Sequence, residues 1–489
     1  MLFNSHIFML LFLPLLLAGW YFLNWKKKFQ LAQGYLIGMS LWFYAYANLQ
    51  YLWLLLFSCL IGWLLSCLPE KIFSEKGKKV LTGVGCVFHL GLLGYFKYSN
   101  FFLENLNTVF HTDFPMLQIL LPVGISFYTF QQLAYLIDRC RGDAPRDSFF
   151  DYLTFMVYFP QLLQGPILLR SEFMGQLKEP ERRRFHAERF SEGIQFFVFG
   201  LAKKVLLADT LAKAVNYGYS NVSMLDSISA LLLAVGYLTE LYFDFSGYCD
   251  MAVGLGKMIG LEVAENFDAP FHSASVKEFW RRWHMTLGRF FTRYVYIPLG
   301  GNRRGKMRTL CNVMIVMLLS GLWHGAAWTF VLWGFLHGVG MIWDNLEHPH
   351  LPKKWMRQAA TFAYVCMTFV FFRAESIAQG FDVLKSIVSL KWNGFVFQMA
   401  SALDMTECYM ITKALSMKLP GLLSWFWLGI FVVLIAICFR VLSGEKVSGV
   451  VALKRQKGYG RLYPVLLAVL FTWSIISMTG VSEYLYFSF

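Results

Sequence analysis

Long apolar blocks, separated by short loops rich in lysine and arginine, run through almost the whole sequence. Charged residues make up only 15% of the chain, whereas soluble globular proteins carry about 25%. Blocks of this length are typical of helices that cross a bilayer, whose hydrocarbon core is about 30 Å thick. The sequence therefore predicts an all-α polytopic membrane protein with about ten or eleven transmembrane helices, together with re-entrant or interfacial helices.

The first apolar block, residues 6–23, favours a retained helix over a cleaved signal peptide. No basic residue precedes it, and Lys26, Lys27 and Lys28 follow it. The positive-inside rule then places the N-terminus outside an inner (cytoplasmic) membrane and the basic loops in the cytoplasm. The net charge of +14 is spread over these loops, which indicates topology control and contact with anionic lipids, and we expect no nucleic-acid partner.

Three longer connections are expected between the apolar blocks. Residues 97–115 should form an external loop after a span at 80–96, and residues 374–422 an external region with one or two short helices. Residues 440–461 are expected to form a basic cytoplasmic loop. None of these stretches is long enough for a soluble domain of ordinary size.

The apolar block 152–169 does not fit a simple alternation of spans. Basic residues flank it on both sides, so a single crossing would place one basic flank outside. Pro160, Gly165 and Pro166 also break a helix in its middle. We predict a re-entrant element, which is tolerated at membrane depth where protein or a wet cavity surrounds it.

The apolar block 310–343 raises the same difficulty. As one helix it would run roughly 50 Å, against a hydrocarbon core of about 30 Å. Its flanks are again basic on both sides. We predict that the block enters and returns with a bend at 321–325, which would put His324 at the apex or wall of a buried cavity.

The connector 276–308 is both basic and aromatic, and Glu278 is its single acid. Two interpretations remain open. It could be an amphipathic helix at the cytoplasmic interface, with aromatic rings at headgroup depth. It could also be a mouth that collects an anionic donor, such as the phosphates of a coenzyme A thioester, because arginine suits phosphate. Its candidate donor- or substrate-binding residues are Trp280, Arg281, Arg282 and Trp283.

Two histidines, His324 and His284, are the candidate catalytic residues. His324 lies inside an apolar block, where polar side chains are uncommon because hydrocarbon offers them no partners. His284 ends the run FWRRWH and should share a helical face with Trp280, four residues earlier. Either ring could instead be structural and bonded to a neighbouring group. Trp323, beside His324, and Asp244, which could orient a histidine or anchor a helix break, are further candidate binding residues. The nine cysteines show no metal-type spacing, so no metal site is expected.

Seven motifs occur in order along the chain. They are FPQLLQGPI (159–167), YFDFSGYCDMAVGLGKMIG (242–260), ENFDAPF (265–271), FWRRWH (279–284), YIPLGGNR (296–303), SGLWHGAAWTFVLWG (320–334) and FFRAES (371–376). This series resembles the bacterial membrane-bound O-acyltransferase (MBOAT) family, in particular the alginate O-acetyltransferase membrane subunit and related polysaccharide O-acetyltransferases. The resemblance implies one integral membrane domain, 1–489, with a core at about 120–380, peripheral N-terminal helices at 1–115 and C-terminal helices at 381–489.

The resemblance also implies a fold and a reaction. Helices would surround a central funnel, and an acyl group would enter from the cytoplasm and leave on the exported side. His324 would be the general base, with His284 as the second characteristic histidine. A neutral imidazole, whose ordinary pKa is about 6.5, is suited to take the proton from a hydroxyl group that attacks a thioester. No bound cofactor is expected, and the acyl donor would be acetyl-CoA or another acyl thioester.

The acceptor stays open at this point. The GGNRRGK loop and the chain length favour O-acetylation of an exported polysaccharide over acyl or D-alanyl transfer to a teichoic-acid-type acceptor. The resemblance implies an exported accessory acyltransferase protein and a polysaccharide synthase complex as partners, besides membrane lipids. An alternative of another class is a transporter or channel with an intramembrane histidine. The sequence shows neither the inverted repeat nor the paired intramembrane acids typical of transporters.

Overall fold

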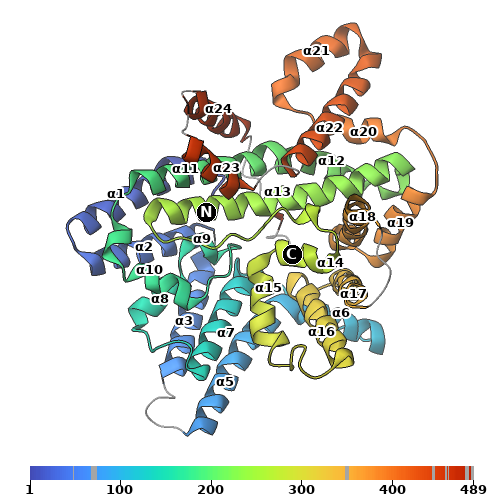
Figure 1. Ribbon diagram of the computed structural model, residues 1–489. Helices are drawn as coiled ribbons and strands as arrows, with labels where there is room; N and C mark the ends of the chain where they lie inside the picture. Colours follow the sequence, from blue (N-terminus) through green and yellow to red (C-terminus); the bar gives the residue numbers. More distant parts are fainter. Residues whose placement is uncertain are drawn as a thin grey trace. The chain divides into compact units, whose positions relative to one another are not determined.

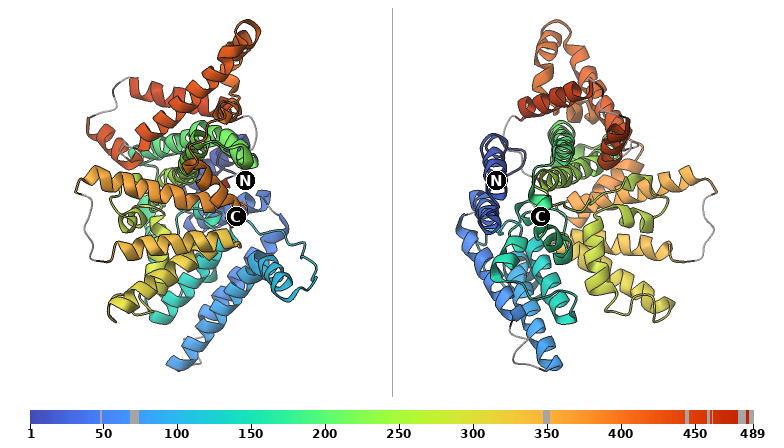
Figure 2. Two further views of the ribbon diagram at one scale, coloured as in Figure 1. Left: turned by 90° about the vertical axis from the view of Figure 1, so that its right-hand side faces the viewer. Right: turned by 60° about the vertical axis from the view of Figure 1, so that its left-hand side comes forward.

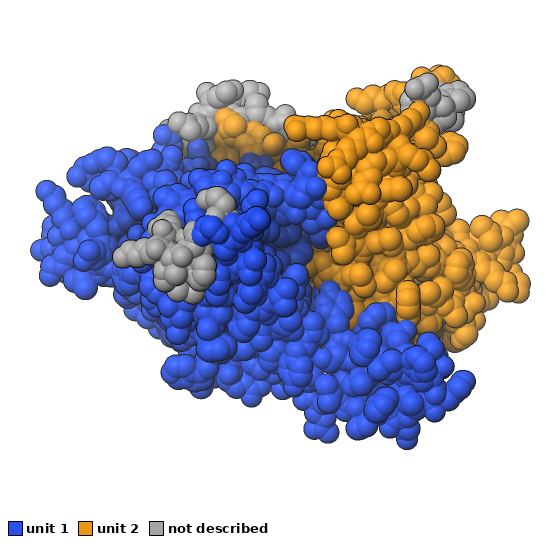
Figure 3. All heavy atoms as spheres, turned by 90° about the horizontal axis from the view of Figure 1, so that it is seen from below, with its two compact units in different colours: residues 1–197, 249–265, 286–298 blue, residues 198–248, 266–285, 299–489 orange. Residues whose placement is uncertain are grey.

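The computed structural model describes residues 1–47, 49–67, 74–346, 352–442, 446–457, 460, 462–478 and 484–485. All regular elements in these ranges are helices (Figure 1), so the all-α prediction is confirmed. The chain forms two compact units (Figure 3). The first comprises Met1–Phe197, Cys249–Glu265 and Thr286–Pro298, and the second comprises Val198–Tyr248, Asn266–Met285 and Leu299–Phe489.

The first part of the chain forms a series of helices up to Leu177. They are η1 (Phe8–Phe12), α1 (Leu13–Trp25), α2 (Phe29–Ala47), α3 (Leu52–Cys67), α5 (Glu75–Leu93), η3 (Gly94–Tyr98), α6 (Ser99–Phe110), α7 (Ile125–Arg141), α8 (Phe149–Met156), α9 (Phe159–Leu162) and α10 (Arg170–Leu177).

The remaining helices include those that carry the candidate site. They are α11 (Ala187–Ala202), η5 (Lys203–Ala208), α12 (Asp209–Ser220), α13 (Ser227–Ile259), α14 (Val276–Arg282), α15 (Met285–Phe291), α16 (Lys306–His324), α17 (Trp328–Trp343), α18 (Lys354–Arg373), α19 (Ile377–Val388), α20 (Phe395–Ser401), α21 (Tyr409–Lys418), α22 (Pro420–Leu442), α23 (Val447–Lys457) and α24 (Leu462–Ser477). Figure 2 shows α17 and α18 side by side.

Within the described residues, six helices are long and apolar enough to cross a membrane, so the multi-pass prediction is confirmed. The helix Ser227–Ile259 differs from the others because 78% of its apolar window is buried in the protein, against 17–39% for the other five. A helix that is apolar all round and buried lies inside a larger fold. The six segments are Phe8–Trp25, Leu49–Cys67, Lys76–Phe110, Ser227–Ile259, Lys306–His324 and Pro420–Leu442. The predicted total of about ten or eleven spans stays a prediction.

Three of the expected connections are wrong in detail. The helix that begins before residue 80 continues to Phe110, because no proline or glycine interrupts it after Gly94 until Pro115. The region 374–422 contains the three α-helices α19, α20 and α21, and α19 is capped by Ser376, whose hydroxyl accepts a hydrogen bond from the Gln379 N–H. The stretch 440–461 contains the helix α23, so it is not only a loop.

The predicted break in block 152–169 is confirmed. Two short helices, α8 and α9, are followed by non-helical backbone to Leu169. A Cβ at Gly165 would lie 2.3 Å from the carbonyl oxygen of Pro160, so only glycine fits this close approach.

The predicted bend in block 310–343 is confirmed as well. Helix α16 ends at His324, Gly325 is extended, and α17 begins at Trp328. The two helices pack closely because glycines face each other: a Cβ at Gly334 would lie 2.5 Å from the carbonyl oxygen of Met317. The bend therefore places His324 at the end of a helix and next to a tight helix pair.

A larger side chain at this contact between α16 and α17 should lower the stability of the helix pair. We expect Gly334→Val to lower the stability of the detergent-solubilised protein by about 1–3 kcal/mol, because the added side chain meets backbone that cannot move aside. The midpoint of thermal unfolding measures the effect. The matched control is Gly429→Val in α22, where a Cβ meets no atom within 4 Å. Equal midpoints for the two variants would contradict the close approach.

The membrane topology gives an independent prediction. Cysteine-accessibility mapping is expected to place residues 140–150, 170–190, 285–308 and 350–357 in the cytoplasm, because a bent block 310–343 returns to the side from which it enters. Residues 350 and 351 lie outside the described ranges. External labelling of 350–357 would show that this block crosses the membrane once.

Candidate active site

His284 lies at a break between two helices of the connector. Helix α14 ends at Arg282, Trp283 is extended, and His284 has a left-handed backbone with φ of 46°. The N–H of Met285, the first residue of α15, donates to the carbonyl oxygen of Asn266 at 2.9 Å. A left-handed backbone is uncommon for a residue other than glycine, and it is often found at functional sites.

This break overturns the prediction that Trp280 and His284 share a helical face. Trp280 instead donates its indole N–H to Nδ1 of His337 at 3.2 Å. The other nitrogen of His337, Nε2, lies 2.9 Å from the hydroxyl of Thr368. Both nitrogens of His337 are thus occupied, which assigns this imidazole and Trp280 a structural role.

His284 and His324 lie together in a buried aromatic enclosure, formed by Phe245, Trp323, Trp333 and Phe372. The two imidazole centroids are 6.4 Å apart, and the exposed fractions are 0% for His284 and 3% for His324. His284 contacts Phe245 at 4.8 Å, and His324 contacts Trp333 and Phe372, both at 5.2 Å, measured between ring centroids. The structure therefore brings the two predicted histidines together.

The hydrogen bond of His284 defines its protonation state. Nδ1 lies 3.2 Å from Oδ1 of Asn266, and an amide oxygen only accepts, so Nδ1 carries the proton. Burial lowers the pKa of His284 to about 3, so the ring is neutral at physiological pH. Nε2 then presents a lone pair, and it has no hydrogen-bond partner among the described residues. A neutral imidazole with an open lone pair can accept a proton or a hydrogen bond.

Trp333 is a member of the enclosure that sequence reasoning missed. Its side chain is completely buried, and its indole N–H has no acceptor within the part of the chain that the structure describes. A buried donor without an acceptor costs about 1–3 kcal/mol of stability. The indole N–H of Trp333 is therefore a candidate to bind a ligand oxygen. The sequence offered no signal beyond its position in the SGLWHGAAWTFVLWG motif.

Trp323 and Trp283 have different surroundings. Trp323 packs on both histidines, with centroid distances of 6.1 Å to His284 and 5.0 Å to His324. Trp283 is 1% exposed and packs on Phe267 and Phe279. Trp323 therefore belongs to the enclosure, whereas Trp283 is a core residue that fixes the backbone just before His284.

Among the described residues, no histidine is a hydrogen-bond or ion-pair partner of Asp244, and Asp244 does not lie at a helix break. It lies within the continuous helix α13 and forms a buried ion pair with Lys204 at 2.7 Å. Lys204 also pairs with Asp209 at 2.7 Å, and the N–H of Leu485 donates to Asp244. Both predicted roles of Asp244 are wrong, because its partners come from segments remote in sequence.

Three of the seven arginines of the connector are held by carboxylates. Arg289 pairs with Glu172, and Arg293 pairs with both Asp138 and Asp143 at 2.9 Å. Because these acids are remote in sequence, the sequence of the connector indicated a larger unpaired positive charge than the structure shows.

The two arginines predicted to bind the donor, Arg281 and Arg282, differ from each other. Arg282 pairs with Glu278 at 2.9 Å and donates to the carbonyl oxygen of Asp268. Arg281 is exposed, so it remains the candidate for contact with an anionic donor.

A polar chamber of about 740 Å³ adjoins the enclosure, because Phe372 lines the chamber and also contacts His324. Among its walls, the carboxyl group of Glu240 is buried, and its Oε2 has no hydrogen-bond partner in the described ranges. A chamber of this size accommodates a small polar ligand. Its polar lining residues include Lys204, Asp209, Asn216, Asp244, Thr329 and Arg373.

A multi-pass helical protein with two neighbouring buried imidazoles, one of them holding an open lone pair, has the features of a membrane enzyme. Residues 141–380 match the model of MBOAT, the membrane-bound O-acyltransferase family. The chain belongs to this family and is an acyltransferase.

Named relatives extend over most of the chain. A peptidoglycan O-acetyltransferase of Helicobacter pylori is 35% identical over 423 residues, which covers 80% of each chain. The probable alginate O-acetylase AlgI of Azotobacter vinelandii is 39% identical over 389 residues, 77% of this chain and 76% of the relative. A teichoic acid D-alanyltransferase of Streptococcus thermophilus is 28% identical over 253 residues, 49% of this chain and 58% of the relative.

Proposed function

We propose that this protein transfers an acetyl group from a cytoplasmic thioester, acetyl-CoA or a similar donor, for O-acetylation of an exported polysaccharide. The observation that carries the proposal is the pair of buried imidazoles 6.4 Å apart, one of them with an open Nε2 lone pair. Two relatives that cover more than three quarters of the chain are named for O-acetylation of peptidoglycan and of alginate. The protein would lie in the inner membrane with its N-terminus outside.

The reaction needs a base and no nucleophile of the protein. His324 takes the proton of the acceptor hydroxyl while its oxygen attacks the thioester carbonyl carbon. The carbon–sulfur bond then breaks, and the leaving thiolate takes the proton from His324. Base catalysis of this kind contributes a factor of about 10²–10⁴ to the rate. The Nε2 lone pair of His284 accepts a hydrogen bond from the same hydroxyl and orients it.

The oxyanion of the transition state requires a hydrogen-bond donor. Trp280 is unsuitable because its N–H is given to His337, and neutral His284 offers only a lone pair in the enclosure. The buried indole N–H of Trp333 has no acceptor among the described residues and belongs to the ring that contacts His324 at 5.2 Å. We assign this N–H to the thioester carbonyl oxygen.

Removing that N–H should slow the reaction without loosening the fold. We expect Trp333→Phe to lower kcat by about 10²-fold, as loss of one oxyanion donor does, while KM for the donor changes little. Initial rates with acetyl-CoA and purified protein in detergent measure this. The control is Trp323→Phe, which also removes an indole N–H from the aromatic enclosure but keeps an aromatic ring against the two histidines. Unchanged kcat in Trp333→Phe would show that Trp333 is not the oxyanion donor, and the backbone N–H groups of residues 325–327 would then be the candidates.

The polar chamber is the proposed entry for the acceptor. Its open Glu240 oxygen, Asn216 and Thr329 can bond hydroxyl groups of a sugar, or of an exported accessory protein that passes the acetyl group to the polymer. A teichoic-acid-type acceptor is less favoured, because the D-alanyltransferase relative covers only half of the chain. A polysaccharide synthase complex would be a further partner.

The test of the proposed function is the acetyl content of exported polysaccharide. Mass analysis of polymer from cells with and without the protein should show O-acetyl groups only when the protein is present. Equal O-acetyl content would refute polysaccharide acetylation, and loss of D-alanine esters instead would favour the teichoic-acid-type acceptor.

A further inference from the structure

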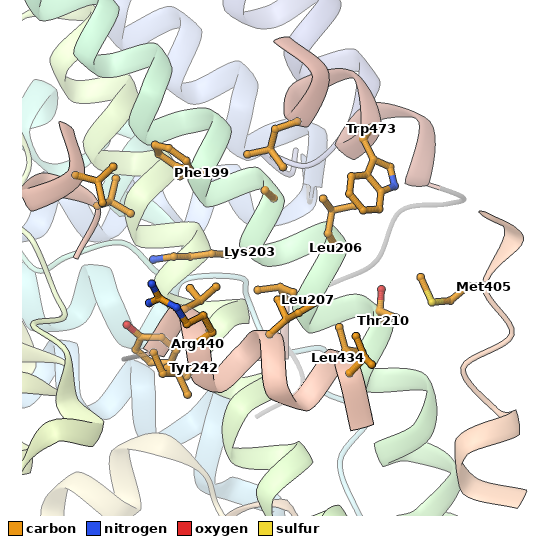
Figure 4. Close-up of a pocket in the computed structure, with 18 of the residues that line it drawn as sticks. Phe199, Lys203, Leu206, Leu207, Thr210, Tyr242, Met405, Leu434, Arg440 and Trp473 are labelled. Atoms are coloured by element: carbon orange, nitrogen blue, oxygen red, sulfur yellow. The ribbon is translucent and has the colours of Figure 1, made fainter. Parts of the chain in front are cut away.

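A second cavity, of about 820 Å³, lies between η5 and the helices α22, α23 and α24 (Figure 4). It is separate from the polar chamber, and the two share no lining residue. Its walls are mainly apolar, which distinguishes it from a site for a sugar. Representative apolar residues are Phe199, Leu206, Val433, Leu434, Ile437 and Leu470.

Four basic side chains line this cavity, and Glu407 is the one acidic side chain in its lining. The charges are not spread evenly. Figure 4 shows the charged ends of Lys203 and Arg440 on the same side, near Tyr242, whereas Met405 and Trp473 lie on the opposite side. The other two basic residues are Lys446, which pairs with Asp268 at 3.6 Å, and Lys454, whose ammonium group lies 4.9 Å from the ring of Tyr463.

The single acid is engaged by its own neighbours. Glu407 accepts hydrogen bonds from the hydroxyl of Ser477 at 2.6 Å and from the indole N–H of Trp473. Burial raises the pKa of Glu407, but the hydrogen bonds to its carboxylate outweigh burial and hold the pKa below its ordinary value. The cavity is thus an apolar groove with the basic side chains of Lys203 and Arg440 at one end.

The position of α22 relates this groove to the bilayer. Pro420–Leu442 is long and apolar enough to span a membrane, and Arg440 lies in its last turn. Arginine at the end of a span lies at headgroup depth. The apolar lining residues Ile430, Val433 and Ile437 precede it along the same helix, toward the hydrocarbon interior.

We propose that this groove binds an anionic diacyl phospholipid. The phosphate contacts Lys203 and Arg440, and the acyl chains lie along α22 and against Leu206. Basic pockets between membrane helices bind anionic lipid headgroups. The apolar side chains along α22 suit the acyl chains of the same lipid. A coenzyme A thioester carrying only an acetyl group would leave most of the apolar wall uncovered, so a lipid fits the groove better than the acyl donor.

The site is also placed to influence catalysis. Lys203 lines the lipid groove, and the next residue, Lys204, lines the polar chamber and holds Asp244. Tyr242, which also lines the groove, precedes Phe245 by three residues on α13, and Phe245 contacts His284. Lipid at the groove therefore supports the backbone segments that position both sites.

Native mass spectrometry of the full-length protein in detergent tests the proposal, with phosphatidylglycerol, phosphatidylcholine and acetyl-CoA added separately as probes. We expect retention of phosphatidylglycerol over phosphatidylcholine. The double variant Lys203→Gln with Arg440→Gln should reduce this retention by about 25-fold, since each cation near an anionic lipid contributes a factor of about five. The matched control replaces the exposed Lys353 and Lys354 by glutamine. Val433→Trp, at an exposed position of the wall, should displace the lipid without removing charge.

Each other outcome would overturn the proposal. Equal retention of both lipids, or unchanged retention in both groove variants, would show that the groove is not an anionic lipid site. Binding of acetyl-CoA that depends on Lys203 and Arg440 would make it the donor site instead. A polypeptide that copurifies with the parent and is lost in Val433→Trp would make it a protein interface. None of these readouts depends on the acetylation reaction, so they are independent of the proposed function.

Discussion

Replacement of His324 by glutamine is expected to reduce acetyl transfer by about 10²–10⁴-fold, the contribution of a general base, while the protein still inserts and unfolds at the parent temperature. Glutamine can replace a hydrogen bond of the imidazole but cannot accept a proton at neutral pH. His324 is 3% exposed and sits among aromatic rings, so its loss should affect chemistry more than packing. Acetyl transfer from labelled acetyl-CoA in proteoliposomes measures the effect.

The matched control is His89→Gln. His89 is also a buried histidine, 1% exposed, with Nδ1 3.3 Å from the hydroxyl of Ser58, and it has no role in the proposed reaction. It should keep parental activity. If His324→Gln retains most activity while His324→Ala misfolds, His324 is architectural and the base is His284.

The second large effect is expected at His284. His284→Gln should lower kcat by about 10²-fold or more, because the open Nε2 that orients the hydroxyl is lost. Asn266→Ala should have a smaller effect of the same kind, since Asn266 fixes the proton on Nδ1. Because burial lowers the pKa of His284 to about 3, kcat should show no ionisation of this ring between about pH 5 and 8.

The kinetic comparison of Asn266→Ala with His284→Gln separates positioning from packing. A positioning role predicts that Asn266→Ala lowers kcat with little change in the thermal unfolding midpoint. If the midpoint falls and kcat falls only in proportion to the amount of folded protein, the Asn266 side chain supports the local fold and does not position His284 for the reaction.

Several features could be predicted from the sequence because they depend on local rules. The bend after His324 followed from the length of block 310–343 compared with the bilayer, and the break in block 152–169 from Pro160 and Gly165. The motifs identified both histidines, and the structure places them 6.4 Å apart. Their catalytic roles remain predictions.

The features that could not be predicted depend on contacts remote in sequence. Neither the pairing of Arg289 with Glu172 nor that of Asp244 with Lys204 leaves a trace in local spacing. The face shared by Trp280 and His284 was inferred from an unbroken helix, but the chain leaves the helix at Trp283. The open N–H of Trp333 is visible only once the surrounding acceptors are known.

The left-handed backbone of His284 has a consequence for how this protein trades stability against activity. Holding a non-glycine residue at a φ of 46° costs on the order of 1 kcal/mol, and glycine or asparagine would bear that conformation with less strain. With the role proposed for His284, glycine or asparagine at this position is expected to raise the thermal unfolding midpoint and to lower kcat.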